Sequence, residues 1–207
     1  MESGHSSVWR LSAAPFEQAI DTPKILKGVE DRYNRIQTLQ VSFSESLTVQ
    51  GRKRTEKGEL YLRKPGRMRW EYAPPSGNLF VSDGKYIYSY FAGEKRATRE
   101  NFKETEDMRA PLAFLLGKLN FNDDFKEFRA EHDHDNVLIT AIPKSDKLPY
   151  SEVTFLVSPD FVIHYLKVKG QDGSITEFTF DNEKKNPPLA DPLFKFTPPP
   201  GVEYEQH

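Results

Sequence analysis

Histidine and acidic side chains alternate in one short run, EHDHD, from Glu131 to Asp135. Imidazole nitrogens and carboxylate oxygens are common ligands of zinc and other transition metals, so such a run could hold an ion. The run falls between two stretches whose apolar residues alternate as in strands, which favours a solvated hairpin turn. His164 lies in another such stretch, with no second ligand at a useful spacing. We therefore predict no metal site and no cofactor.

Ser82 and Lys85, in the run SDGK, have the spacing of the Ser-x-x-Lys nucleophile of some acyl-transfer enzymes. In those enzymes a helix stacks the serine and the lysine on one face. Here Asp83 and Gly84 form a dipeptide that is typical of a hairpin turn. The sequence also contains no cysteine, no Gly-x-Ser-x-Gly, no phosphate-binding glycine loop and no His-Glu-x-x-His motif. We predict that the protein is not an enzyme.

A basic and aromatic stretch, YLRKPGRMRWEY (residues 61–72), suggests binding instead. Successive side chains of a strand point to opposite faces. One face would carry Met68, Trp70 and Tyr72, and the other Arg67, Arg69 and Glu71. In the preceding stretch, Leu60, Leu62 and Lys64 would share a face opposite Tyr61 and Arg63. We expect the apolar sets to line a concave interior and the arginines to face solvent. Because aromatic stripes usually pack, Met68 and Trp70 could be plain core, with a ligand-binding cavity as the alternative.

The overall composition excludes some partners. With 207 residues and a formal net charge of -2, the chain has no charge excess that would point to nucleic acid. No run approaches the roughly 18 apolar residues of a membrane span. The start, MESGHSSVWRLSAAP, lacks the apolar core of a secretory signal. We interpret residues 1–15 as an added or processed end, and residues 16–207 as one domain.

Two amphipathic helices are predicted. In DTPKILKGVEDRYNRIQTL, apolar residues recur at helical spacing, with Thr22 as N-cap, Pro23 at the first helical position and an end near Leu39. In EDMRAPLAFLLGKL, four leucines stand at i, i+3, i+4 and i+7, and the helix should end near Gly117. These leucines are Leu112, Leu115, Leu116 and Leu119.

Strand-like runs with short turns fill most of the remaining chain. The turns KPG, APPSG, SDG and AGE are too short for parallel crossovers, so they favour an antiparallel meander. We expect a loop at Asp123 and Asp124, and a short edge strand at residues 194–196 of the proline-rich tail. About eleven strands, covered by two helices, should curl into an unclosed, half-open antiparallel β-barrel.

Three segments carry a resemblance to a known family: GELYLRKPGRMRWEYAPPSGNLFVSDGKYIYSY, APLAFLLG and FKFTPPPGVEYE. From about Thr22 to Glu205, the chain resembles the outer-membrane lipoprotein carrier family, LolA. The resemblance implies a half-open barrel whose helical lid covers a hydrophobic cavity for the acyl chains of lipoproteins. The residues that it assigns to the cavity and lid are Leu60, Leu62, Met68, Trp70, Tyr72, Leu112, Leu115 and Leu116.

The resemblance also implies partners and a compartment. These are acylated lipoproteins or lipids, an inner-membrane donor complex and an outer-membrane acceptor, with a monomeric carrier in the periplasm and no nucleic acid. A sensor or carrier domain of the same fold that binds another lipid is the alternative. A hydrolase on this scaffold is the least favoured function.

One position departs from the family pattern. The family has an arginine before the proline of this stretch, where it holds the lid closed by bonding to backbone carbonyls, and here that position is Lys64. Arg63 should point to the opposite face and is the less favoured latch. Because helix C-termini expose unpaired carbonyls, we predict that the Lys64 ammonium bonds to one of them. A lysine would hold the lid less tightly than the guanidinium fork of an arginine.

Overall fold

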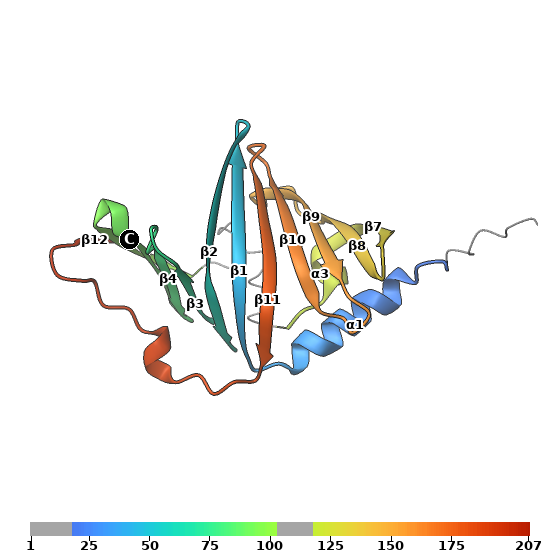
Figure 1. Cartoon of the computed structure of the whole chain (residues 1–207), viewed down its shortest axis with the longest axis horizontal. Helices are drawn as coiled ribbons and strands as arrows, with labels where there is room; N and C mark the ends of the chain where they lie inside the picture. Colours follow the sequence, from blue (N-terminus) through green and yellow to red (C-terminus); the bar gives the residue numbers. More distant parts are fainter. Residues whose placement is uncertain (1–17, 103–117) are drawn as a thin grey trace, which may run out of the picture.

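The structure, a computed structural model, describes residues 18–102 and 118–207, and one strongly curved sheet dominates it (Figure 1). The strands are β1 (Thr38–Val49), β2 (Arg52–Arg63), β3 (Arg67–Tyr72), β4 (Leu79–Asp83), β5 (Tyr86–Phe91), β6 (Arg96–Asn101), β7 (Phe125–Asp133), β8 (Asn136–Pro143), β9 (Tyr150–Val157), β10 (Ile163–Gly170), β11 (Ile175–Lys185) and β12 (Glu203–Gln206). The helical segments are α1 (Thr22–Arg35), η1 (Ala92–Glu94), α3 (Phe121–Asp124) and η3 (Asp191–Phe194).

The sheet does not close on itself. Its order is β12-β6-β5-β4-β3-β2-β1-β11-β10-β9-β8-β7, with β12 and β7 at the two ends. The predicted half-open barrel is therefore confirmed. The described residues contain twelve strands rather than about eleven, and β12 pairs with β6 in parallel.

The predicted edge strand at residues 194–196 is wrong. Phe194 ends the short helix η3, in which Pro192 lies in the first turn, and the edge strand β12 begins only at Glu203. Prolines 198 to 200 offer no N–H groups for a sheet ladder, so pairing starts after them. The expected loop at Asp123 and Asp124 is also corrected, because both residues belong to α3.

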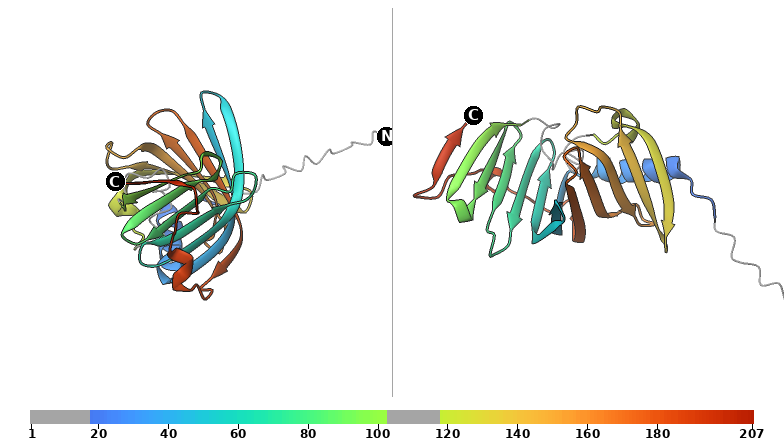
Figure 2. Two further views of the ribbon diagram at one scale, coloured as in Figure 1. Left: turned by 90° about the vertical axis from the view of Figure 1, so that its left-hand side faces the viewer. Right: turned by 90° about the horizontal axis from the view of Figure 1, so that it is seen from above.

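Helix α1 crosses the half of the sheet that contains β8 to β11 (Figure 2). Its N-cap is Asp21 rather than Thr22: the Asp21 carboxylate accepts a hydrogen bond of 3.2 Å from the Lys24 amide. The helix ends at Arg35, earlier than expected, and Ile36 is already extended. Its buried face joins the core through Leu26, Val29 and Tyr33, and Ile36 follows them into the core.

The core is a single apolar layer along the inner face of the sheet. Trp70 of β3 packs edge-on against Phe43 of β1, with ring centroids 5.0 Å apart, and lies 5.6 Å from Phe178 of β11. Alternate residues of β3 are buried as the period of two predicts. The strands on both sides of β1 thus contribute rings to one continuous layer.

Gly58 of β2 allows this layer to form, because it stands opposite both Phe43 and Tyr72. A Cβ at this position would lie 1.9 Å from the carbonyl oxygen of Glu71 and 2.8 Å from Cζ of Phe43. Since the first neighbour is backbone, Gly58→Ala should lower the free energy of unfolding by about 3 kcal/mol. Chemical denaturation measures this. Gly93→Ala, which would meet nothing within 4 Å, is the control; equal stability of the two variants would contradict the prediction.

Candidate functional site

The residues predicted to line a concave interior do share one buried face. Leu60, Leu62, Met68, Trp70 and Tyr72 all belong to the core. The Trp70 indole N–H donates to the Met68 sulfur at 3.4 Å. Leu60 lies opposite Trp70, and Leu62 opposite Met68, in the β2–β3 ladder. The structure therefore places these five side chains together in a packed apolar layer.

A groove of about 920 Å³ opens where this layer reaches the ends of the strands, between the β1–β2 hairpin, the β3–β4 turn and η1. Tyr72 is the member of the predicted set that lines it. Phe80 and Phe91 line it as well, and the rings form edge-to-face pairs, with centroids 5.6 Å apart for Tyr72–Phe80 and 5.7 Å for Phe80–Phe91. The charged groups at the groove are Glu45, Arg54, Glu56, Lys57 and Glu94.

Sequence reasoning did not include Phe80 and Phe91 in the site. The signal was present, because both lie in runs with strand-like alternation, NLFVS and KYIYSYF. The pairing of β3 with β4 and of β4 with β5 places Phe80 opposite Trp70 and brings Phe91 close to Phe80. The groove combines an aromatic floor with a charged rim, an arrangement suited to amphipathic ligands.

Lys64 reaches the C-terminal turn of α1. Its ammonium donates a 2.6 Å hydrogen bond to the carbonyl oxygen of Tyr33, and burial lowers the pKa of this lysine. A void of about 10 Å³ lies between Lys64, Leu62 and the end of the helix. The predicted contact with a helix C-terminal carbonyl is present. Its role as a lid latch stays a prediction, since Leu112, Leu115 and Leu116 lie outside the described residues.

Lys64→Met should loosen the last turn of α1, because the Tyr33 carbonyl would lose its charged donor. A hydrogen bond to a charged group contributes about 1.5–3 kcal/mol, so amide exchange at residues 33–37 should become at least roughly tenfold faster. Hydrogen–deuterium exchange with mass spectrometry measures this. Lys57→Met, at an exposed lysine of the preceding strand β2, is the control. Unchanged protection in the Lys64 variant would show that the bond does not hold the helix.

The opposite face of β2 and β3 is covered by the C-terminal segment. Arg63 donates to the Leu189 carbonyl at 2.8 Å, pairs with Asp191 and lies 5.0 Å from the Phe194 ring centroid. Arg69 donates to the Leu193 carbonyl at 3.2 Å. The expectation that Arg63 and Arg69 face solvent is therefore wrong. Tail carbonyls that have no sheet partner are satisfied by these guanidinium groups instead.

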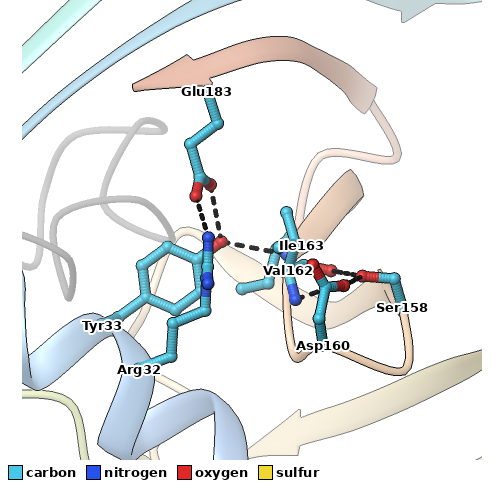
Figure 3. A network of polar contacts seen from close by, with 7 residues as sticks. All are labelled: Arg32, Tyr33, Ser158, Asp160, Val162, Ile163 and Glu183. Carbon is cyan, nitrogen blue, oxygen red and sulfur yellow. Dashed lines mark hydrogen bonds and ion pairs between the residues drawn. The ribbon is translucent and has the colours of Figure 1, made fainter. Parts of the chain in front are cut away.

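A polar cluster that sequence reasoning missed fastens α1 to β10 and β11 (Figure 3). Glu183 forms an ion pair with Arg32, and the Tyr33 hydroxyl donates to its other oxygen at 3.1 Å. The Ile163 amide donates to the Tyr33 oxygen at 3.0 Å. Burial, together with the Glu183 charge, raises the pKa of Tyr33. The Arg32 pKa is raised too: burial lowers it, but the hydrogen bond and charge of Glu183 outweigh burial.

A β-bulge aims Glu183 at the helix. In the β1–β11 ladder, Ser42 pairs with Asp181 and Gln40 with Lys184, so two residues of β11 oppose one of β1. Asn182, one of these two, has φ 55°. The extra residue reverses the alternation of β11 and turns Glu183 to the face that carries Phe178 and Phe180.

The EHDHD and SDGK motifs, first considered for chemistry, have structural roles in turns and strands. His134 and Asp135 form the turn between β7 and β8, and the predicted hairpin is confirmed. The Ser82 hydroxyl donates to the Gly66 carbonyl at 2.7 Å, while the Lys85 ammonium lies 5.0 Å from the Tyr86 ring centroid. Within residues 18–102 and 118–207, no group of three or more His, Asp or Glu side chains is arranged to hold a metal ion. Over the same residues, no helix has the length and apolar character of a membrane span.

Comparison with known proteins gives consistent matches. The family profile described as "Outer membrane lipoprotein carrier protein LolA" matches residues 34–197. An outer-membrane lipoprotein carrier protein of Chromobacterium violaceum is 26% identical over 166 residues, covering 80% of each chain. The outer-membrane lipoprotein carrier protein of Nitrosomonas europaea is 26% identical over 180 residues, covering 86% of this chain and 87% of its own.

Solved structures share the fold at low identity. An uncharacterized conserved protein from Thermus thermophilus superposes with a TM-score of 0.55 at 12% identity, over 89% of this chain and 98% of its own. A DUF1329 family protein from Desulfovibrio piger has a TM-score of 0.50 at 13% identity, over 84% of this chain and 96% of its own. The half-open sheet is thus a known architecture, and the profile match spans most of it. The chain belongs to the LolA family of outer-membrane lipoprotein carrier proteins.

Proposed function

We propose that this protein is a periplasmic carrier that binds the acyl chains of lipoproteins and delivers them to the outer membrane. The observation that carries the proposal is the continuous apolar inner layer of the sheet, which reaches an open groove of about 920 Å³ lined by both aromatic and charged side chains. Membership of the lipoprotein carrier family supports it.

The energetics explain why a carrier needs such a surface. Each methylene removed from water contributes about 0.8 kcal/mol, so an acyl chain of roughly fifteen methylenes contributes on the order of 12 kcal/mol. A lipoprotein in transit must find a comparable apolar surface on its carrier. In this proposal the acyl chains enter along the groove and extend over the inner layer that contains Leu60, Met68 and Trp70. The proposal assigns Leu112, Leu115 and Leu116, which lie outside the described residues, to the lid.

The partners in this proposal follow from its chemistry. An inner-membrane donor complex loads the acylated cargo, and an outer-membrane acceptor receives it. The carrier acts as a monomer with a single domain over residues 16–207, and it catalyses no reaction. Transfer requires only that the acceptor offers the acyl chains a surface more favourable than the groove.

A fluorescent fatty acid tests acyl binding. Its emission should rise on addition of the folded protein, and long-chain lipids should compete for the site. Phe91→Asp, at the groove, should weaken binding at least tenfold, because a charge would replace an apolar contact. Phe128→Asp, a comparably half-buried phenylalanine on β7, should leave binding within twofold. No probe binding by the folded wild type, and no lipid in organic extracts of the purified protein by mass spectrometry, would refute the proposal.

A further inference from the structure

The β1–β2 hairpin extends beyond its neighbours in the sheet (Figure 1). Its ladder continues to Val49–Arg52. On one side β3 pairs with β2 only from Gly58, and on the other side β11 pairs with β1 as far as Thr48. Two large hydrophobic side chains of this extension are exposed: Leu47 is 40% exposed and Val49 44% exposed. We call residues 47–55, with the sequence LTVQGRKRT, the hairpin tip.

The hairpin tip is strongly basic, although the chain as a whole has a formal net charge of -2. Arg52, Lys53 and Arg54 are consecutive and exposed, and the tip contains no acidic residue. The ladder places Arg52 opposite Val49 and Arg54 opposite Leu47, so these two cations and the two apolar side chains share one side of the hairpin.

Neighbouring acidic groups leave the cations accessible. Arg54 pairs with Glu56 at 3.0 Å and Lys53 with Glu177 at 3.7 Å, yet the two cationic side chains stay 69% and 58% exposed. Exposed pairs of this kind contribute little free energy and rearrange readily. Asp172, in the adjacent β10–β11 turn, accepts hydrogen bonds from the Ser174 amide and hydroxyl at 2.9 and 2.6 Å, within its own turn.

Exposed aliphatic side chains flanked by clustered cations are the combination that binds anionic lipid surfaces. The aliphatic groups insert at the headgroup boundary while the cations meet the lipid phosphates. We infer that the hairpin tip is a docking element for an anionic membrane surface. Arg54 also lines the groove, so docking would bring the groove close to the bilayer. This inference complements the proposed carrier function, but the binding itself requires no cargo.

Vesicle co-sedimentation of the full chain, without lipoprotein, tests the inference. The protein should bind vesicles of three parts phosphatidylcholine to one part phosphatidylglycerol, should bind pure phosphatidylcholine much less, and should dissociate as salt is raised. Each cation near an anionic surface contributes about a fivefold gain. The triple variant R52Q/K53Q/R54Q should therefore bind roughly a hundredfold less. L47S/V49S should bind about tenfold less, because it has less apolar surface to insert.

The matched control is K184Q/K185Q/K195Q, which also removes three exposed cations, two of them at the far end of β11. It should bind within twofold of the wild type. Because the chain contains no cysteine, Val49→Cys can carry a single environment-sensitive fluorophore, whose emission should shift to the blue on anionic vesicles. The same label at Lys195→Cys should not shift.

Three outcomes would overturn the inference: no binding of the wild type to anionic vesicles, an equal loss in the control, or an unshifted label at position 49. If tip variants impaired lipoprotein transfer without any vesicle binding, the tip would recognise a protein instead, and the inference would be wrong. If the protein bound anionic vesicles but not the fatty-acid probe, the docking inference would be supported and the carrier proposal would be refuted.

Discussion

Glu183→Ala should lower the free energy of unfolding by about 3 kcal/mol, because it leaves the Arg32 guanidinium poorly solvated and without its carboxylate. The two side chains are only 16% and 15% exposed. The variant also removes the acceptor of the Tyr33 hydroxyl. Urea denaturation measures the loss, and amide exchange should rise along α1, since this cluster fastens the helix to β10 and β11.

Two further variants make the Glu183 test specific. Glu152 pairs with Arg129 at 3.6 Å, and the Arg129 side chain is 74% exposed. Glu152→Ala should therefore change the free energy of unfolding by less than about 1 kcal/mol. The double variant R32M/E183M should recover much of the loss of Glu183→Ala, because a buried ion pair can be replaced by apolar groups at little cost. If the double variant lost as much free energy of unfolding as Arg32→Met and Glu183→Met lose together, the two residues would act independently. That result would refute the fastening role.

Trp70→Ala should lower the free energy of unfolding by about 4 kcal/mol. The indole is fully buried, and its removal would leave a void beside Phe43 and Phe178. Thermal and urea unfolding measure the change, and Trp70→Phe, which keeps a ring in the layer, should retain most of the stability.

The same variant distinguishes the two interpretations of the aromatic stripe. If Trp70 is core, stability falls and the affinity for a fatty-acid probe changes little in the fraction that remains folded. If Trp70 lines a cavity that opens for acyl chains, stability falls by less than about 1 kcal/mol while probe affinity changes strongly. The carrier proposal, in which cargo displaces part of the packed layer, predicts that stability and probe affinity both change.

Most of the sheet could be predicted from the sequence because its signals are local. Period-two alternation and turn residues mark β1 to β11, and the Gln50–Gly51 turn, with φ 48° and 77°, connects the longest pair. The pairing of β12 with β6 could not be predicted in this way. It joins segments about a hundred residues apart, and local periodicity contains no information about such a contact.

Glu183 shows how a local irregularity conceals a contact. In the run DNEKK it appears to be one of several solvated charges. A single bulge residue at Asn182 reverses the alternation and turns the carboxylate to Arg32 and Tyr33. For the arginines of β3, the period of two predicts the correct face of the strand. It does not predict the neighbour on that face: Arg69 contacts the C-terminal segment instead of water.

The sequence by itself determined the alternation of β2 and β3, and with it the inner position of Leu60, Leu62, Met68, Trp70 and Tyr72. It also indicated the direction in which Lys64 points: continued one residue past the end of β2 at Arg63, the alternation places Lys64 on the face of Leu60 and Leu62. The tertiary structure alone decided which carbonyl Lys64 meets, that Phe80 and Phe91 join Tyr72 at the groove, and that Arg63 and Arg69 hold the C-terminal segment. These contacts depend on the register of the strand pairs and on the path of the chain ends, which arise from the packing of the whole chain rather than from any short stretch of it.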